Sequence, residues 1–297
     1  MKRVTAAVRG PVFVLLAACA VLAADSISGL EVSVRAREIA PGEPIRVVVR
    51  SPGSLASLEG RFLEQRVYMV RESATGDGEV WSGWTMVPLD QNAMAAAIDL
   101  EGTRKDGTAV IATHAVSIRD KDFPEERLTV SSKYVEPPAE VRERLAKERA
   151  EVAKVYRTRR DLAPAGESFV RPVPGEPTST FGKRRFFNDK PRSPHPGLDL
   201  RAATGTPVKA AGAGVVATAQ DLYYSGNTVI IDHGGGLFTI YAHLSEIEVS
   251  VGDEVAAGES IGNSGATGRV TGPHLHWGAK IGDRPFDPAA LLDPALF

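Results

Sequence analysis

The sequence contains only one cysteine, Cys19, in 297 residues. A single cysteine cannot form an intrachain disulfide, and it excludes zinc sites built on Cys-x-x-Cys pairs. Any zinc ion would therefore need nitrogen and oxygen ligands, taken from the carboxylates and from the six histidines.

The chain also lacks a predominant sign of charge, with 35 Lys and Arg residues against 37 Asp and Glu residues. This balance argues against bulk electrostatic binding of nucleic acid, and no nucleic-acid partner is expected. Hydrophobic residues make up 43% and charged residues 24% of the chain, which is typical of a folded globular protein. The length is suited to two domains.

A long apolar run occurs only near the start, from Val12 to Ala24. It is shorter than the about 20 residues that a membrane-spanning helix needs. Because basic residues precede it and small residues end it, we predict a signal peptide over residues 1–24 and export to the periplasm or cell envelope. A buried N-terminal helix is the alternative, which the abrupt polar stop at Asp25 disfavours.

Cys19 follows Leu16-Ala17-Ala18, and this tetrad resembles the bacterial lipobox. The resemblance implies a lipid anchor at Cys19, which would become the first residue of a membrane-anchored lipoprotein. Cleavage after Ala23 or Ala24 is the alternative, and the sequence leaves both open.

Residues 28–134 have the pattern of short β-strands. Apolar and polar residues alternate in 30–34, 45–49 and 110–116, and Gly- and Pro-containing turns separate the runs. About seven such strands predict an immunoglobulin-like β-sandwich without its disulfide. An envelope protein that binds through residues 28–134 is a partner interaction that the sequence leaves open.

Residues 136–162 have a different composition, with no glycine or proline from Ala139 to Arg160. Apolar residues there fall on one helical stripe, and charged residues of both signs surround it. The stripe consists of Val141, Leu145, Val152, Val155 and Tyr156. We predict an amphipathic helical linker that packs this stripe on a neighbouring domain.

Residues 166–297 are rich in glycine, with 19 of the 29 glycines between Gly166 and Gly282. Short strand-like runs lie between these glycines, and tight turns joining short strands predict a compact, mainly β domain. The whole chain is therefore expected to be mainly β, with a second sandwich-like domain at its C-terminal end.

Four histidines of this domain lie in extended segments. In a strand, residues two apart share a face, so His195 and Asp199 can converge, as can His274 and His276. His243 ends a strand in which it alternates with Ala242 and shares a face with Tyr241.

These residue types suit metal-assisted hydrolysis. Catalytic zinc has three protein ligands of nitrogen or oxygen type and keeps a fourth position for water. Two further imidazoles near that water can deprotonate it and stabilise an oxyanion. Each motif alone is weak, because an isolated strand histidine is usually structural. Their joint occurrence indicates a zinc hydrolase acting on an amide, whereas His114 and His233 are predicted to be structural.

The motifs Thr180-Phe181-Gly182, Ser193-Pro194-His195-Pro196-Gly197-Leu198-Asp199, Tyr241-Ala242-His243-Leu244 and Gly272-Pro273-His274-Leu275-His276 resemble those of the lysostaphin/LytM-type zinc metallopeptidases. The resemblance covers about residues 178–294. It implies the duplicated hybrid motif fold and cleavage of peptide bonds in the stem peptides or cross-bridges of peptidoglycan. It further implies that His195, Asp199 and His276 bind zinc (Zn2+), and that His243 and His274 form the catalytic pair.

The alternative function is a non-catalytic envelope regulator that activates another cell-wall hydrolase. Such homologues typically lose metal ligands, and this chain retains all five expected residues. The segment 183–201 carries six basic residues against two aspartates. We hypothesise that this segment attracts carboxylates of the substrate peptide, with a solvated loop as the alternative.

Overall fold

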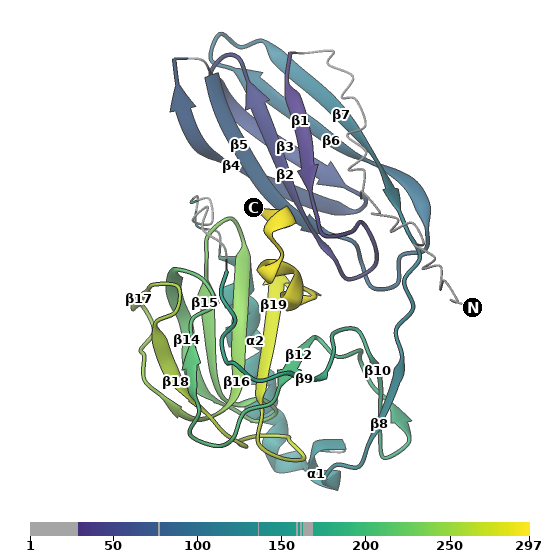
Figure 1. Cartoon of the computed structure of the whole chain (residues 1–297), viewed down its shortest axis with the longest axis vertical. Coiled ribbons are helices and arrows are strands. Elements are labelled where there is room, and N and C mark those ends of the chain that lie inside the picture. The colour runs from purple at the N-terminus through teal and green to yellow at the C-terminus, as the bar shows by residue number, and fades with distance from the viewer. Residues whose placement is uncertain (1–28, 77, 136, 159, 161, 163–168) are drawn as a thin grey trace, which may run out of the picture.

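The computed structural model describes residues 29–297, except residues 77, 136, 159, 161 and 163–168. The expected signal peptide and the lipid anchor at Cys19 lie outside the described residues. Within these residues the chain is mainly β, as the sequence predicted (Figure 1). None of the described helices has both the length and the apolar character that a bilayer span requires.

The N-terminal part is a two-layered sandwich of seven antiparallel strands. These are β1 (Glu31–Arg35), β2 (Pro44–Ser51), β3 (Leu55–Phe62), β4 (Gln65–Thr75), β5 (Gly78–Met86), β6 (Met94–Arg104) and β7 (Ala109–Ile118). The strand order is β1-β2-β5-β4 in one layer and β3-β6-β7 in the other, joined by pairing of β3 with β4. This is the strand order of a seven-stranded immunoglobulin sandwich, so the predicted fold of this part is confirmed.

The C-terminal part is built on a ten-stranded sheet. Its strands are β9 (Pro177–Ser179), β12 (Gly197–Leu200), β13 (Pro207–Lys209), β14 (Gly214–Leu222), β15 (Gly226–Asp232), β16 (Leu237–Ile247), β17 (Glu254–Val255), β18 (Ser260–Ser264), β19 (Leu275–Ile281) and β20 (Arg284–Phe286). The main path runs β17-β14-β15-β16-β19-β12-β9, while β13 and β18 pair with each other and β18 returns to β16. Two 3-10 helices, η2 (Pro288–Leu292) and η3 (Pro294–Leu296), end the chain.

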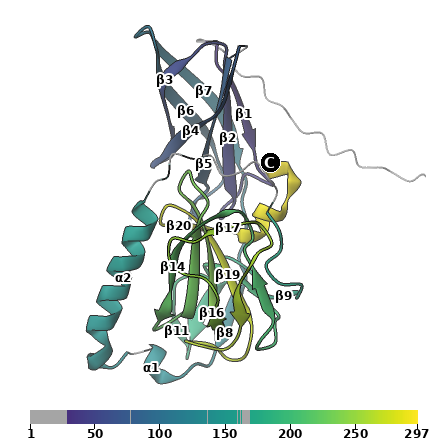
Figure 2. The ribbon, with the colours of Figure 1, turned by 90° about the vertical axis from the view of Figure 1, so that its left-hand side faces the viewer.

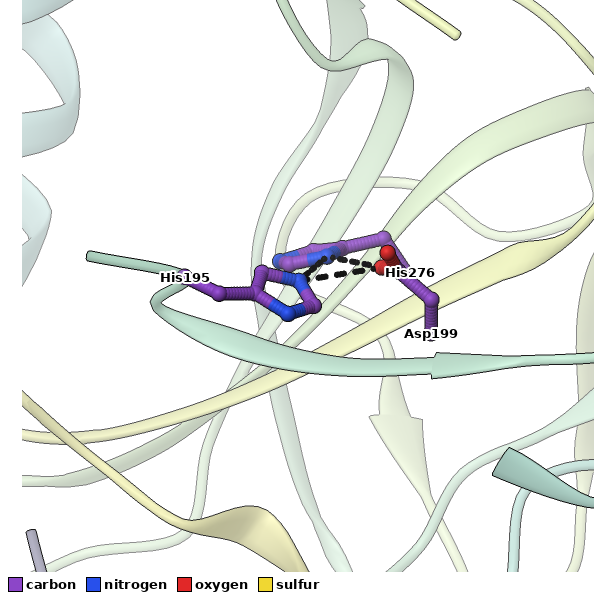
Figure 3. Close-up of side chains that lie close together, drawn as sticks. All are labelled: His195, Asp199 and His276. Atoms are coloured by element: carbon purple, nitrogen blue, oxygen red, sulfur yellow. Dashed lines mark hydrogen bonds and ion pairs between the residues drawn. The ribbon is translucent and has the colours of Figure 1, made fainter. Parts of the chain in front are cut away.

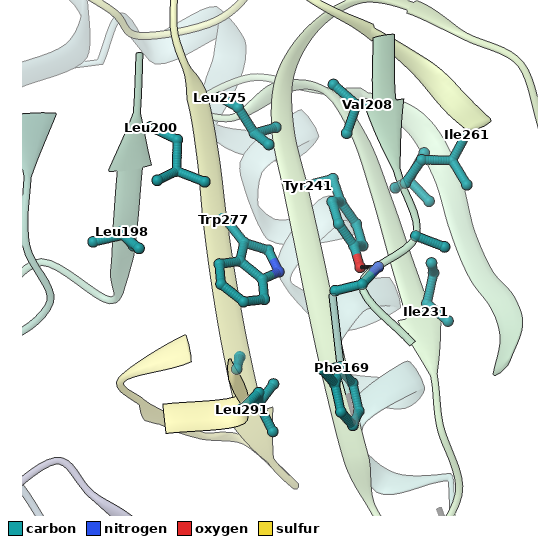
Figure 4. Close-up of a cluster of buried hydrophobic side chains, with 14 of the residues drawn as sticks. Phe169, Leu198, Leu200, Val208, Ile231, Tyr241, Ile261, Leu275, Trp277 and Leu291 are labelled. Atoms are coloured by element: carbon teal, nitrogen blue, oxygen red, sulfur yellow. Dashed lines mark hydrogen bonds between the residues drawn. The ribbon is translucent and has the colours of Figure 1, made fainter. Parts of the chain in front are cut away.

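The core of this part lies beneath β16 and β19 (Figure 4). Tyr241 and Trp277 are neighbours in register on these two strands, and both side chains are fully buried. The Tyr241 hydroxyl accepts a hydrogen bond from the Ala211 backbone N–H over 2.6 Å, which satisfies its polar end inside the core. The two central strands are therefore fixed on their inner face.

The predicted linker contains η1 (Ala139–Val141) and the longer α2 (Arg142–Arg157), and the short α1 (Ser132–Val135) precedes it. The apolar stripe of α2 faces the C-terminal sheet, with Leu145 and Tyr156 buried. Tyr156 packs edge-on against Phe238 of β16, with 5.3 Å between the ring centroids. The amphipathic helix that the sequence predicted is confirmed, and it covers the sheet face seen at the left in Figure 2.

The chain between the sandwich and the helix forms β8 (Glu125–Leu128). This strand pairs in parallel with β10 (Arg184–Phe187), which in turn pairs with β11 (Lys190–Pro191). Residues 125–128, which the sequence places with the sandwich, thus add a strand beside the C-terminal sheet. This pairing joins segments about sixty residues apart and has no local sequence signal.

The sandwich rests directly on the C-terminal end of the chain (Figure 1). Trp84 of β5 lies in the same buried cluster as Leu291 and Leu296, and its ring is 6.0 Å from that of Phe297. Arg37 donates a hydrogen bond to Asp287 over 2.7 Å across the same junction. Apolar packing and a partly buried ion pair therefore hold the two parts together.

Candidate metal centre

The side chains of His195, Asp199 and His276 converge on one point (Figure 3). His195 Nε2 lies 3.1 Å from Asp199 Oδ1 and 3.2 Å from His276 Nδ1, and His276 Nδ1 lies 2.8 Å from Asp199 Oδ1. Three ligands at about 2.0–2.1 Å from a tetrahedral zinc ion would be separated by about 3.3 Å. The triangle is close to one face of such a tetrahedron, so the three donors fit a zinc ion.

Sheet register places two of these residues. Asp199 on β12 and His276 on β19 are directly opposite each other in the antiparallel pair. Gly197 permits the close approach, because a Cβ atom there would lie 2.7 Å from His276 Cε1 and 2.5 Å from a backbone oxygen. His195 precedes β12, and its own N–H donates to the Lys183 carbonyl.

Backbone carbonyl groups set the orientation of three histidine rings. His195 Nδ1 donates to the Thr180 carbonyl, and His274 Nδ1 donates to the Gly272 carbonyl, each over 2.9 Å. His243 Nδ1 donates to the Thr267 carbonyl over 2.9 Å. Each bond fixes the proton on Nδ1 and leaves Nε2 with its lone pair, which is how metal-binding and basic histidines are usually oriented.

His243 reaches this site through an irregularity in β16. Between Tyr241 and Leu244 the strand has one residue more than the facing segment of β15 between Asn227 and Val229, which marks a β-bulge. His243 occupies the bulge with φ +65°, a left-handed conformation that is unusual for a residue other than glycine.

Because of the bulge, the His243 side chain lies on the opposite face of β16 from the one that the sequence predicted. Regular alternation would place it with Tyr241 in the core, whereas its ring lies 4.9 Å from that of His274 and 6.0 Å from that of His276. The sequence therefore identified the residue but not the reason that it reaches the site.

Burial and neighbouring charges shift the ionisation of the site. Burial, together with the electrostatic effect of the neighbouring His276 and His274 side chains, lowers the pKa of His243 to about 3. Burial also lowers the pKa of His195. Burial alone would raise the pKa of Asp199, but its hydrogen bonds with His195 and His276 lower it well below the ordinary range. Neutral imidazoles beside an ionised carboxylate are the forms that bind a metal ion.

A second layer around Asp199 was missed by the sequence analysis. Arg185 of β10 donates to Asp199 Oδ2 over 2.9 Å and to Glu126 of β8 over 2.8 Å. Glu126 also accepts hydrogen bonds from Ser179 and Lys183. Burial would raise the pKa of Glu126, but these donors lower it, so Glu126 is ionised.

These contacts change the interpretation of the basic segment 183–201. Lys183 and Arg185 are paired with Glu126, and Arg184 lies 4.0 Å from Glu125. Much of the local excess of positive charge is thus neutralised by β8 rather than left for a substrate. The sequence shows the basic residues, but it does not show that Glu125 and Glu126 lie beside them, because the pairing of β8 with β10 is long-range.

A groove opens beside the converging side chains, and it is lined by Asp199, His243, His274 and His276. Arg185 and Arg269 also line it, as do Leu128 and Val130 from the segment that begins with β8. His114 and His233 do not line this groove. His233 is buried between the Ala213 carbonyl and Thr239, which agrees with the structural role predicted for it. His114 lies half-buried on β7, and its structural role stays a prediction.

Residues 193–288 match peptidase family M23. This domain belongs to peptidase family M23. The match confirms the resemblance to the lysostaphin/LytM-type metallopeptidases, and it covers all five histidine and aspartate residues described above.

The peptidase M23 domain has named relatives. It is 46% identical over 109 residues to the peptidoglycan DD-endopeptidase ShyA of Vibrio cholerae, which covers 36% of this chain and 25% of ShyA. It is 44% identical over 100 residues to the DD-carboxypeptidase/endopeptidase Mpg of Neisseria meningitidis, covering 34% of this chain and 23% of Mpg. The chain thus spans about a quarter of the length of these curated relatives.

Similarity to one solved structure extends beyond the peptidase M23 domain. A putative peptidase M23 from Pseudomonas aeruginosa is 29% identical, with a TM-score of 0.64, over 88% of this chain and 96% of that chain. The overlap therefore includes most of the N-terminal sandwich. The arrangement of a β-sandwich followed by a peptidase M23 domain occurs in both proteins.

Proposed function

We propose that this chain is a zinc-dependent endopeptidase that hydrolyses peptide bonds in the stem peptides or cross-bridges of peptidoglycan. The observation that carries the proposal is the triangle of donor atoms from His195, Asp199 and His276, with two further histidines beside it. The names of the relatives ShyA and Mpg support the substrate and the reaction type.

Each residue has a distinct role in this proposal. His195, Asp199 and His276 hold the metal ion, which when bound supplies a Lewis acid that polarises a carbonyl and acidifies water. His243 presents a neutral Nε2 that accepts a proton from the attacking water. His274 Nδ1 donates to the Gly272 carbonyl in the same way, so its Nε2 would offer a second acceptor that orients the attacking water.

The geometry favours catalysis over the alternative of a non-catalytic regulator. A regulator needs neither a complete ligand set nor oriented imidazoles, yet this chain has both. The regulator therefore has no structural feature in its favour.

The proposal is tested on the chain purified without residues 1–24. We expect about one zinc ion per molecule and digestion of purified peptidoglycan sacculi that stops on chelation and returns with zinc. Mass analysis of the released fragments identifies the bond that is cut. Sacculi left intact by the zinc-loaded chain would contradict the proposal.

We further propose that the chain acts in the periplasm or cell envelope, where such a substrate lies. The basic and apolar composition of residues 1–24 supports export. Lipidation at Cys19 and cleavage after Ala23 or Ala24 give mature chains of different mass. The intact mass of the protein isolated from membranes therefore distinguishes the two.

A further inference from the structure

Arg269 lies on the wall of the groove that His243, His274 and His276 line. Its guanidinium lies over two aromatic rings, 4.7 Å from the ring centroid of Phe187 and 4.9 Å from that of Tyr224. Stacking of this kind holds a guanidinium in one plane and leaves its N–H edge directed away from the rings. The side chain is therefore fixed before any ligand arrives.

The loop that carries Arg269 is also anchored. The Arg269 backbone N–H donates to the Tyr224 carbonyl over 2.8 Å. The preceding Gly268 carbonyl accepts a hydrogen bond from the Tyr134 hydroxyl over 2.8 Å, and Thr267 Oγ1 donates to the Leu244 carbonyl. These bonds attach the loop to α1, to the turn between β14 and β15, and to β16, so the position of Arg269 is set by the fold.

The groove has more positive than negative charge near this residue. Asp199 is the only acidic side chain among the described residues that line the groove. It is already engaged by Arg185 and by the two histidines of the ligand triangle. Of the two arginines that line the groove, Arg185 forms ion pairs with Glu126 and Asp199, whereas Arg269 forms none with the described residues.

We infer that Arg269 binds a free carboxylate of the peptide that is cleaved, and that it makes this carboxylate a requirement for efficient cleavage. A planar guanidinium matches a planar carboxylate through two parallel hydrogen bonds. The inference rests on the proposed function for the substrate class. The sequence suggested this role for the basic segment 183–201. Because glutamates of β8 pair with basic side chains of that segment, we assign the role to Arg269 instead.

The test uses pairs of synthetic peptides that differ only in whether one carboxylate is free or amidated. For the zinc-loaded wild-type chain, we expect amidation of one particular carboxylate to lower kcat/KM about 10- to 100-fold. Arg269→Gln should lower kcat/KM for the free acid by a similar factor and cleave the acid and amide forms about equally. Arg269→Lys keeps the charge and should retain a smaller preference.

Arg184→Gln is the matched control, because it removes one exposed guanidinium from the same region outside the groove lining. It should discriminate between acid and amide as the wild type does. Zinc content and thermal unfolding of each variant report whether the fold and the metal centre are intact. Equal discrimination by the wild type and Arg269→Gln would overturn the inference, as would a wild type that is indifferent to every amidation.

Binding measured without turnover separates this inference from the proposed function. The same peptide pairs are titrated into the metal-free wild-type chain and into Arg269→Gln. We expect about tenfold tighter binding of the acid form, lost in the variant. If no peptide is hydrolysed but this preference is found, the carboxylate site stands and the proposed hydrolysis fails. If peptides are hydrolysed without any such preference, the reverse holds.

Discussion

Arg185 and Asp199 form a largely buried ion pair in which Nη2 donates to Oδ2 over 2.9 Å. The other carboxylate oxygen, Oδ1, is the one that faces His195 and His276. Arg185 thus holds the carboxylate through Oδ2 and leaves Oδ1 available to a metal ion. Loss of a group that orients a ligand in this way typically lowers metal affinity about 10- to 100-fold.

Replacing Arg185 by alanine should weaken zinc binding about 10- to 100-fold, because Asp199 loses the donor that orients it. Zinc affinity is measured by competition with a chromophoric chelator. Arg184→Ala removes a neighbouring exposed guanidinium and should leave the affinity unchanged. Equal affinities in the two variants would show that Arg185 does not position Asp199.

Replacements of the five site residues should divide into two classes. His276→Ala removes a proposed ligand and should abolish both zinc binding and peptidoglycan hydrolysis. His243→Ala and His274→Ala should retain about one zinc ion per molecule while hydrolysis falls about 10²- to 10⁴-fold. Metal analysis and fragment release are measured on the same preparations. Normal digestion by His276→Ala would show that the ligand assignment is wrong.

At position 243, a glycine variant should be more stable toward unfolding than an alanine variant. Its left-handed backbone with φ +65° costs about 1 to 2 kcal/mol for a residue with a Cβ atom, and glycine avoids this cost. Both variants lose the imidazole, so the comparison isolates the backbone. We expect His243→Gly to exceed His243→Ala in unfolding free energy by about 1 kcal/mol in denaturant titrations of the metal-free chain. A less stable glycine variant would argue against strain at the bulge.

His233 should make stability depend on pH outside the metal centre. Its Nδ1 donates to the Ala213 carbonyl and its Nε2 lies 2.7 Å from the Thr239 hydroxyl, in a fully buried setting. Burial lowers the pKa of His233 to about 4. The unfolded chain therefore takes up a proton below about pH 6.5, but the folded chain takes it up only below about pH 4.

The stabilising contribution of neutral His233 is thus complete above about pH 6.5 and is lost as the pH falls to about 4, by about 3 kcal/mol in total. His233→Asn keeps a donor for the Ala213 carbonyl and removes the titrating group. Unfolding free energies measured at pH 7 and pH 4.5 should therefore differ less in the variant than in the wild type. An unchanged difference would mean that other groups cause the acid sensitivity.

The sequence by itself determined the residue types and much of the fold. Alternating apolar residues specified the sandwich strands, and the apolar stripe containing Leu145 and Tyr156 specified α2. The period of two also places His274 and His276 on the same side of one extended segment, since successive side chains of a strand point to opposite faces. These features are local, so neighbouring residues are enough to reveal them.

Tertiary structure alone decided how the site is completed. The bulge that turns His243 away from the core arises from the unequal pairing of β16 with β15. Glu126 reaches Arg185 only because β8 pairs with β10 across 59 positions of sequence. Arg269 acquires its place from the rings of Phe187 and Tyr224, which come from different parts of the fold. Long-range pairing has no counterpart in local sequence patterns, so the single cysteine and the histidines indicated the kind of site but not what surrounds it.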